Sequence, residues 1–287
     1  MDSMKPEVQA ILFGGIGNQL FQFAYARKLA LELGGFVSLD LRTLPSRGQQ
    51  AGSSITDLDI EFLGAISSKS RVKSYIRKPF VLRSFRQQST PFSDFLLRVD
   101  KNPLSSARRR IRVANYFQDK SAVEFYSGAK PISLREPKDL VQREYATVGS
   151  PGVVTVHHRL GDTLSLRESR GQLGEKFFQD SIELLRNELG DIRELYVYSD
   201  TPELSKELLE RWLPDIRKTW APDGLSAAHV LTALARAKHL ILSNSTMSWW
   251  AAAAGEHENI ITPSKWDRLG NDSLILDNWI KIYPDWA

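Results

Sequence analysis

The chain has 287 residues, of which 42% are hydrophobic and 25% are charged, the composition of a globular protein with room for two domains. It contains no cysteine, which excludes disulfides, thiol nucleophiles and zinc–thiolate sites. Its apolar runs are far shorter than the roughly 20 residues that cross a bilayer. We therefore expect a cytoplasmic protein that is at most peripheral to the inner face of a membrane.

The first half of the chain opens with one predicted β-turn-α-β unit of a parallel sheet. A short apolar strand enters a glycine turn, a helix with apolar residues at helical spacing follows, and Gly34 and Gly35 end that helix. Beyond the second strand the sequence is polar and basic, with weaker periodicity. The elements predicted here are strand 8–13, helix 18–33, strand 36–40 and helices near 67–78 and 91–100.

The second half alternates strands and helices after Ser150-Pro151-Gly152, the best candidate hinge. Such alternation is typical of a parallel sheet covered by helices. We expect an α/β protein with two Rossmann-like domains, 1–149 and 150–287, whose strands offer their carboxyl ends to a central cleft. The elements predicted after the hinge are strands 153–157, 194–199, 239–243 and 259–262 and helices 174–189, 202–212, 225–238 and 246–254.

The glycine turn has the sequence GGIGNQ at 14–19. Glycines let the backbone approach a ligand, and the helix that follows presents free N–H groups. Asp40 stands where a dinucleotide-binding protein keeps its ribose acid, so one alternative is a nicotinamide-dependent oxidoreductase. Leu20 occupies the third glycine position of GxGxxG and argues against that alternative. A tight turn without any ligand would also explain the glycines.

A second motif, VVTVHHRLGDT at 153–163, is a strand that ends in two histidines and an arginine. The planar fork of Arg159 suits bidentate contacts with a diphosphate. Adjacent strand residues point to opposite faces, so one of His157 and His158 should face the core and the other the cleft. The spacing does not favour a metal site, because HxxxH is absent and no third ligand is near.

The third motif, HLILSNSTMSWWAAAAGE at 239–256, is a buried strand that ends in clustered hydroxyls and opens a helix. Hydroxyls and a helix N-terminus together form an anion site that needs no metal. Helix capping by Ser245 or Thr246 would be the simpler explanation, but four consecutive polar residues exceed what a cap requires.

Two aspartate positions admit more than one interpretation. Asp200 follows the strand of LYVYSDTPE, where it could bind a guanine edge or a ribose, or cap the next helix. Asp57-Leu58-Asp59 has the Asp-x-Asp pattern of metal-dependent glycosyltransferases. It lies far from the phosphate-like motifs, and we interpret it as incidental.

A basic stretch, 69–112, carries 13 lysines and arginines against Asp94 and Asp100, with four phenylalanines interleaved. Such a segment could dock on an anionic membrane or on nucleic acid. A solvated charged face over an aromatic core stripe explains it equally well. We expect peripheral membrane contact through this stretch and no nucleic-acid partner.

Taken together, the motifs resemble glycosyltransferase family 11, the α-1,2-fucosyltransferases. They occur in the family's order and span almost the whole chain, and NSTxSWW makes the set specific. The matching stretches are GGIGNQLFQFAYARKLA (14–30), NYFQDK (115–120), VHHRLGDT (156–163), YSD (198–200), NSTMSWWAA (244–252) and PSKW (263–266).

The resemblance implies a GT-B-type fold and metal-independent, inverting transfer of L-fucose from GDP-β-L-fucose to the 2-hydroxyl of a galactoside. It implies no cofactor, a donor-binding domain at 150–287, an acceptor-side domain at 1–149, and as partners GDP-fucose and a galactose-terminated glycan. From the basic stretch we expect that glycan to be lipid-linked, and the lack of cysteines and of a membrane anchor favours a role such as O-antigen assembly. The implied catalytic residues are Arg159, Asp162, His157 and Asn18, and the implied donor- or substrate-binding residues are Gly15, Gly17, Gln19, Asp200, Asn244, Ser245, Thr246 and Ser248.

Within the family reading, Arg159 would hold the diphosphate and Asp200 would recognise the nucleoside. The base that takes the acceptor's proton stays open among Asp162, His157 and Glu168, and Asn18 alone could orient the hydroxyl. Other GDP-sugar transferases, such as one using GDP-mannose, and a non-catalytic glycan-binding protein are alternatives. The chain departs from the family pattern at Leu160 (arginine), Thr163 (tyrosine), Thr201 (aspartate) and Met247 (phenylalanine).

Overall fold

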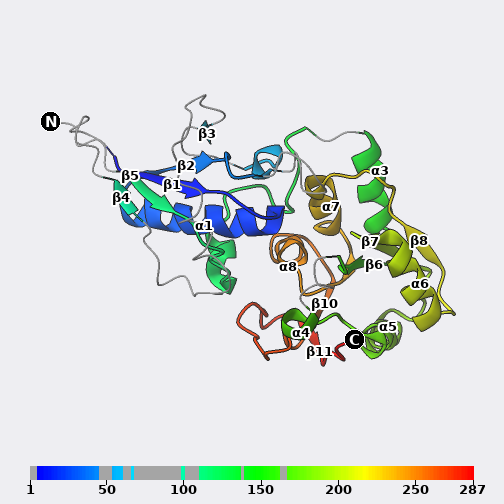
Figure 1. Ribbon diagram of the computed structural model, residues 1–287. Helices are drawn as coiled ribbons and strands as arrows, with labels where there is room; N and C mark the ends of the chain where they lie inside the picture. The colour runs from blue at the N-terminus through cyan, green and yellow to red at the C-terminus, as the bar shows by residue number, and fades with distance from the viewer. Residues whose placement is uncertain are drawn as a thin grey trace. The chain divides into compact units, whose positions relative to one another are not determined.

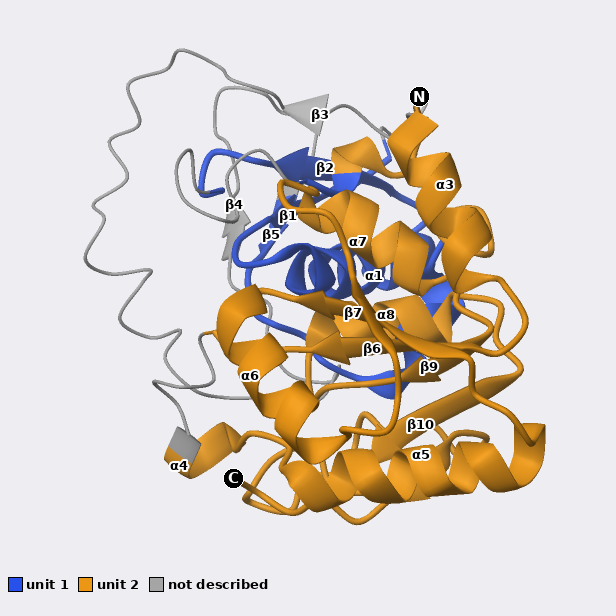
Figure 2. Ribbon diagram, turned by 90° about the vertical axis from the view of Figure 1, so that its right-hand side faces the viewer, with its two compact units in different colours: residues 1–55, 60–127 blue, residues 56–59, 128–287 orange. Residues whose placement is uncertain are grey.

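The computed structural model describes residues 5–44, 54–60, 66–67, 98–100, 110–136, 139–161 and 167–287. Figure 1 labels the helices and strands, and Figure 2 colours two compact units. The first unit comprises residues 1–55 and 60–127, and the second comprises residues 56–59 and 128–287. Each unit is an α/β structure built on its own sheet.

The first unit contains a five-stranded sheet in the order β3-β2-β1-β5-β4. Its strands are parallel except β4, which pairs antiparallel with β5. The elements are β1 (Glu7–Ile11), α1 (Ile16–Glu32), β2 (Phe36–Asp40), β3 (Ile66–Ser67), β4 (Arg98–Asp100), β5 (Arg110–Val113) and the 3-10 helix η2 (Lys120–Phe125), with a further 3-10 turn, η1 (Ile55–Asp57), at the junction of the units.

The predicted β-turn-α-β unit is confirmed at the start of the chain. Gly14 has a positive φ of 74°, which a residue with a side chain adopts only with strain, so glycine is required at the turn. Residues 19–26 of α1 are all buried, because the helix packs on β1 and β2 and also on η2. The turn therefore sits on a rigid support at the carboxyl end of β1.

The helices predicted near 67–78 and 91–100 are wrong where the structure describes those residues. Residue 67 ends a strand, and residues 98–100 form β4. Residues 68–97 lie outside the described part of the chain. Residues 98–100 form a strand because they pair with β5, and local periodicity does not reveal such a distant partner.

The second unit contains a six-stranded, fully parallel sheet in the order β11-β10-β9-β6-β7-β8. All four strands predicted after the hinge are present; β8, β11 and the helix before the hinge were not predicted. The elements are α3 (Asp139–Val148), β6 (Val153–His158), α4 (Arg167–Arg170), α5 (Glu175–Leu189), β7 (Glu194–Ser199), α6 (Pro202–Trp212), β8 (Lys218–Trp220), α7 (Ala227–Leu234), β9 (His239–Ile241), α8 (Thr246–Ala253), β10 (Asn259–Pro263) and β11 (Ile280–Ile282).

An apolar core joins one face of this sheet to α5 and α6. The inward residues alternate along β6 and β7, as period-two strands require. The core members from these four elements include Val154, Val156, Leu195, Val197, Phe177, Phe178, Ile182, Leu185, Leu209 and Trp212. This packing fixes the central strands and so fixes the residues that follow their carboxyl ends.

The opposite face of β7 is polar and binds α3. Glu144 is buried, and its carboxylate accepts hydrogen bonds from the hydroxyls of Tyr196 at 2.8 Å and Tyr198 at 2.7 Å. Burial, together with that carboxylate, raises the pKa of both tyrosines, which keeps them as donors. These bonds tie α3 to β7 within the second unit, which comprises residues 56–59 and 128–287.

Candidate functional site

The polar residues of the second and third motifs meet at one edge of the second sheet. β6 lies between β9 and β7, with Val156 paired to Ile241 and His158 paired to Ser199. Arg159, Asp200 and Ser243 therefore follow three neighbouring parallel strands. The carboxyl ends of such strands are the usual place for ligands in open α/β sheets.

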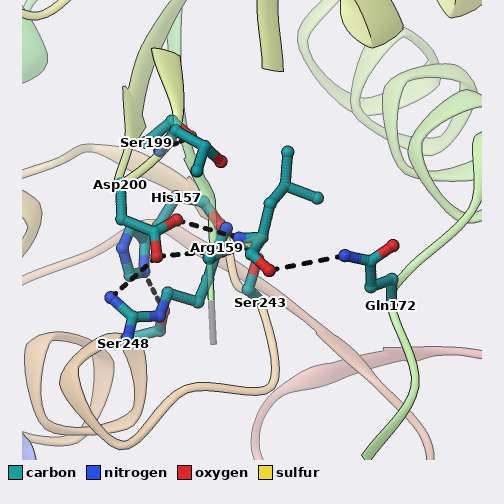
Figure 3. Close-up of polar contacts among 10 residues, drawn as sticks. His157, Arg159, Gln172, Ser199, Asp200, Ser243 and Ser248 are labelled. Carbon is teal, nitrogen blue, oxygen red and sulfur yellow. Dashed lines mark hydrogen bonds and ion pairs between the residues drawn. The ribbon is translucent and has the colours of Figure 1, made fainter. Parts of the chain in front are cut away.

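Arg159 is held at this edge through its backbone. Its N–H donates to Ser243 Oγ at 3.0 Å, and the same hydroxyl donates to the carbonyl of His157. The Arg159 side chain is 22% exposed, and its Nη1 lies 3.1 Å from Oδ2 of Asp200 (Figure 3). The arginine predicted to hold a diphosphate thus lies at the strand end, with its charged group within reach of solvent.

Asp200 makes contacts that neither sequence interpretation included. Its Oδ1 accepts a hydrogen bond from the N–H of Leu160 at 2.9 Å, and its Oδ2 accepts one from the N–H of Gly161 at 3.0 Å. The residue at the N-cap of α6 is Thr201, so the helix-capping alternative for Asp200 is wrong. Its role in nucleoside recognition remains a prediction.

The two histidines lie on opposite faces of β6, as predicted from strand geometry, but both are buried. His157 Nδ1 bonds to Ser248 Oγ on α8, and His158 Nδ1 lies 2.8 Å from Ser205 Oγ on α6. The His158 ring packs edge-on against Phe178. His158 is therefore the core histidine.

Burial controls the charge of both rings. Burial, aided by the charge of Arg159, lowers the pKa of His157 to about 3. Burial, aided by His157, lowers the pKa of His158 to about 3. Both imidazoles are neutral at pH 7, and His157 is a weak proton acceptor. This electrostatic setting disfavours His157 as the catalytic base and suits a positioning role.

The serine-rich turn divides into buried and accessible residues. Asn244 is buried and donates to the carbonyl of Arg170 at 3.0 Å, and Ser248 is buried against His157. Ser245 and Thr246 are only half-buried. Ser245 stands at the N-cap of α8 but makes no side-chain cap bond, so the capping alternative is wrong for Ser245. First-turn N–H groups have no partner within a helix, and an anion can bind them.

In the first unit, the residues of GGIGNQ have different surroundings. Gly15 is half-buried, and Gly17 and Gln19 are buried. Gln19 Nε2 donates to the carbonyl of Gly14 at 3.1 Å, and its Oε1 accepts from the N–H of Ile55 at 3.2 Å. With 1% exposure, Gln19 holds the turn together, so this geometry does not support the predicted contact with substrate.

Asn18, by contrast, is half-buried and has a partner that sequence reasoning missed. Its Oδ1 accepts a hydrogen bond from Gln118 Nε2 at 3.1 Å. Gln118 is placed by Phe117, which has a positive φ of 49° and stacks on Tyr25 at 3.8 Å between ring centroids. A bulky residue in this conformation is strained and is often found near functional sites. The motif NYFQDK was the available signal.

Asp40 does not have the environment of a ribose-binding acid. Arg42 donates to its carboxylate through both the backbone N–H at 3.1 Å and Nε at 2.7 Å. Burial raises the pKa of Asp40, but the hydrogen bonds from Arg42 outweigh burial and hold the pKa below its ordinary value. With Leu20 fully buried at the third glycine position, the first unit offers little support for a nicotinamide site.

Several candidate residues lie elsewhere. Asp162, Thr163 and most of the basic stretch 69–112 are outside the described residues. Glu168 is exposed on α4, and Asp57 and Asp59 are exposed on either side of buried Leu58.

Among the residues the structure describes, no three His, Asp or Glu side chains are grouped to hold a metal ion. No helix in these ranges is long and apolar enough to cross a membrane.

Comparisons with known proteins connect this geometry to an activity. No protein-family model matches the chain. It is 25% identical to an alpha-1,2-colitosyltransferase of Escherichia coli, over 96% of the chain and 98% of that protein. It is 22% identical to the O-antigen biosynthesis glycosyltransferase WbnK of Escherichia coli, over 94% of the chain and 99% of that protein.

Solved structures share the fold. The α-1,6-fucosyltransferase NodZ soaked with GDP-fucose superposes with a TM-score of 0.53 and 16% identity, over 88% of this chain and 93% of that chain. POFUT1 in complex with GDP superposes with a TM-score of 0.51 and 10% identity, over 90% and 96% of the two chains. The predicted GT-B-type α/β fold is therefore confirmed. Fold and relatives together support a glycosyltransferase.

Proposed function

We propose that the protein transfers L-fucose from GDP-β-L-fucose to the 2-hydroxyl of a terminal galactose, with inversion and without a metal ion. The observation that carries this proposal is the position of Arg159, held at the carboxyl end of β6 beside the start of α8. A guanidinium and the N-terminus of a helix are two metal-free ways to bind a diphosphate.

The reaction breaks the bond between the sugar's anomeric carbon and the β-phosphate oxygen and forms a bond to the acceptor oxygen. GDP leaves with added negative charge. Arg159, Ser245, Thr246 and the first N–H groups of α8 stabilise that charge, because they are fixed before the reaction begins. This arrangement lowers the barrier to leaving-group departure.

The acceptor hydroxyl must also lose its proton. Asp162 is our candidate for the base, because a carboxylate accepts a proton more readily than the buried, neutral His157. Asn18 is our candidate for orienting the hydroxyl through its carboxamide, which the Gln118 side chain holds in place. Asp162→Asn and Asn18→Ala, assayed for turnover at saturating GDP-fucose, separate these roles.

A second donor has support from the name of one relative. One relative is named an alpha-1,2-colitosyltransferase, so we propose colitose as the alternative to fucose as the donor sugar. A panel containing the nucleotide donors of fucose, colitose and mannose decides the donor by relative kcat/KM. An acceptor panel should include lipid-linked glycans, because the second relative is named for O-antigen biosynthesis.

We also propose that the stretch 69–112 holds the enzyme at an anionic membrane in the cytoplasm, where such a lipid-linked acceptor would be found. Its 13 basic residues against two acidic ones give the required charge. Co-sedimentation with anionic vesicles should be strong at low salt and weak at high salt. Binding that is absent, or unaffected by salt, contradicts this part of the proposal.

The first experiment is calorimetric GDP binding without metal, for the wild type and Arg159→Ala. Losing charge-assisted contacts should weaken binding by about 10- to 100-fold. The matched control is Arg217→Ala, which removes an exposed arginine directly before β8 and should leave GDP binding unchanged. A folded wild-type protein that binds no GDP rejects the proposal and leaves the non-catalytic alternative.

A further inference from the structure

The carboxylate of Asp200 connects two neighbouring strand ends. Asp200 follows β7, and its two oxygens accept hydrogen bonds from the backbone N–H groups of Leu160 and Gly161, which follow β6. Figure 3 shows the carboxylate beside the backbone of this turn and beside the guanidinium of Arg159. The turn after Arg159 is thus fixed from across the strand pair.

Gly161 shows how closely the carboxylate approaches. A Cβ atom added at Gly161 would lie 2.2 Å from Oδ2 of Asp200 and 3.1 Å from its Cγ. Real side chains do not tolerate such distances, so glycine at 161 provides the space that Asp200 occupies. The amide of Gln172 further fixes the turn by donating to the Leu160 carbonyl at 3.4 Å.

The same carboxylate oxygen that accepts from Gly161 also contacts Arg159. Oδ2 lies 3.1 Å from Nη1 of the arginine. A carboxylate has about four lone-pair positions, and a guanidinium has five N–H donors. Contact at the Nη1 end holds the guanidinium beside the carboxylate. Together with the two backbone bonds, this contact uses three of the carboxylate's roughly four positions, whereas the two N–H donors of a guanine edge would need two of them.

We infer that Asp200 is a positioning residue, which fixes the Arg159 guanidinium for the diphosphate, and is not the residue that reads the guanine base. This inference rests on the proposed function, because it assumes that Arg159 binds a diphosphate. It replaces the nucleoside-recognition role expected from sequence with a role carried through Arg159. The distinction is measurable. A residue that positions Arg159 changes the affinity for every diphosphate, whereas a residue that reads the base changes only the affinity for the complete nucleotide.

The test compares two probes, GDP and inorganic pyrophosphate, on wild type, Asp200→Ala and Arg159→Ala without metal. If Asp200 positions Arg159, Asp200→Ala weakens both probes by the same factor of about ten. The double variant then binds no more weakly than Arg159→Ala, because the two residues act as a unit. Asp215→Asn, which removes an exposed acid after α6, is the matched control and should change neither affinity.

Loss of GDP affinity with unchanged pyrophosphate affinity overturns the inference, because it identifies a base reader. Unchanged affinity for both probes also overturns it. A wild-type protein that binds neither probe rejects the proposed function and this inference with it. If Asp200→Ala does not fold, Gly161→Ala is the second variant: it displaces the carboxylate and should weaken both probes equally.

Discussion

The carboxyl ends of the two central strands, β1 and β6, are built from different chemistry. At β6 the polar groups include a guanidinium paired with a carboxylate, which also binds the backbone, and a buried imidazole bonded to Ser248. At β1 the groups are the carboxamide of Asn18, after the turn, and that of Gln118, which bonds to it. Ionic groups suit a diphosphate, and neutral amides suit the hydroxyls of a sugar. The contrast favours donor chemistry at β6 and acceptor chemistry at β1.

The largest expected effect comes from Arg159→Ala, which removes the cation at β6. Turnover of GDP-fucose should fall by about 10²–10³-fold, because the charge on departing GDP loses a fixed partner. Arg159→Lys keeps the charge without the planar fork, so its turnover should lie between that of the wild type and that of Arg159→Ala. Steady-state kinetics at saturating acceptor measures this. Equal turnover in all three proteins would show that the arginine at the end of β6 takes no part in the reaction.

The second effect is a pH dependence of stability at β6. His157 and His158 have pKa values of about 3 when folded, against an ordinary value near 6.5. The unfolded chain binds protons below pH 6.5 that the folded chain does not. Stability is therefore full above pH 6.5 and falls as the pH falls towards 3. At pH 5 the loss should be about 2 kcal/mol for each histidine.

Denaturant unfolding at pH 7 and pH 5 measures this loss. His158→Gln should remove one histidine's share of it, with Ser205 still able to bond the new amide. The difference between wild type and variant isolates His158 from the other titrating groups. Identical pH dependence in both proteins would show that the His158 ring is protonated in the folded protein at pH 5. The carboxyl ends of β1 and β6 would then differ less in their chemistry than described.

The third effect concerns the turn at β1. Gln19→Leu fills the same space but leaves the Gly14 carbonyl and the Ile55 N–H without this side chain's hydrogen bonds. The free energy of unfolding should fall by about 1–2 kcal/mol, independent of pH between 5 and 8. Thermal unfolding of the two proteins tests this. A variant with wild-type stability and a raised KM for the acceptor would instead show that Gln19 contributes to substrate binding.

The smallest effect is expected for Gln118→Ala, which frees Asn18. The KM for the acceptor should rise by about three- to tenfold, and GDP affinity should not change. Gln179→Ala, at an exposed position on α5, is the control that should change neither constant. Weaker GDP binding in Gln118→Ala would contradict the assignment of acceptor chemistry to β1.

The regular second half could be predicted because its strands carry a strong local signal. The predicted strand 153–157 and helix 246–254 are both confirmed within one residue, as β6 and α8. Strand β4 could not be predicted, because only its pairing with β5 defines it. The short strands β8 and β11 likewise depend on neighbours distant in sequence.

The site residues follow the same division. Strand geometry correctly placed Arg159 at a strand end and the two histidines on opposite faces. The bonds from Asp200 to the backbone after β6 join residues forty positions apart, which no local pattern contains. Gln118 depends on the unusual backbone of Phe117, and its motif signalled the region without indicating that it contacts Asn18.

The narrow space between Gly161 and Asp200 has a consequence for how this protein can evolve. A side chain at 161 would collide with the carboxylate at 200, so either position restricts the other. Among homologous sequences the two positions should therefore covary: glycine at 161 should accompany aspartate at 200, and lineages that lose one should lose the other. An enzyme engineer who wishes to vary this turn has to redesign both positions together.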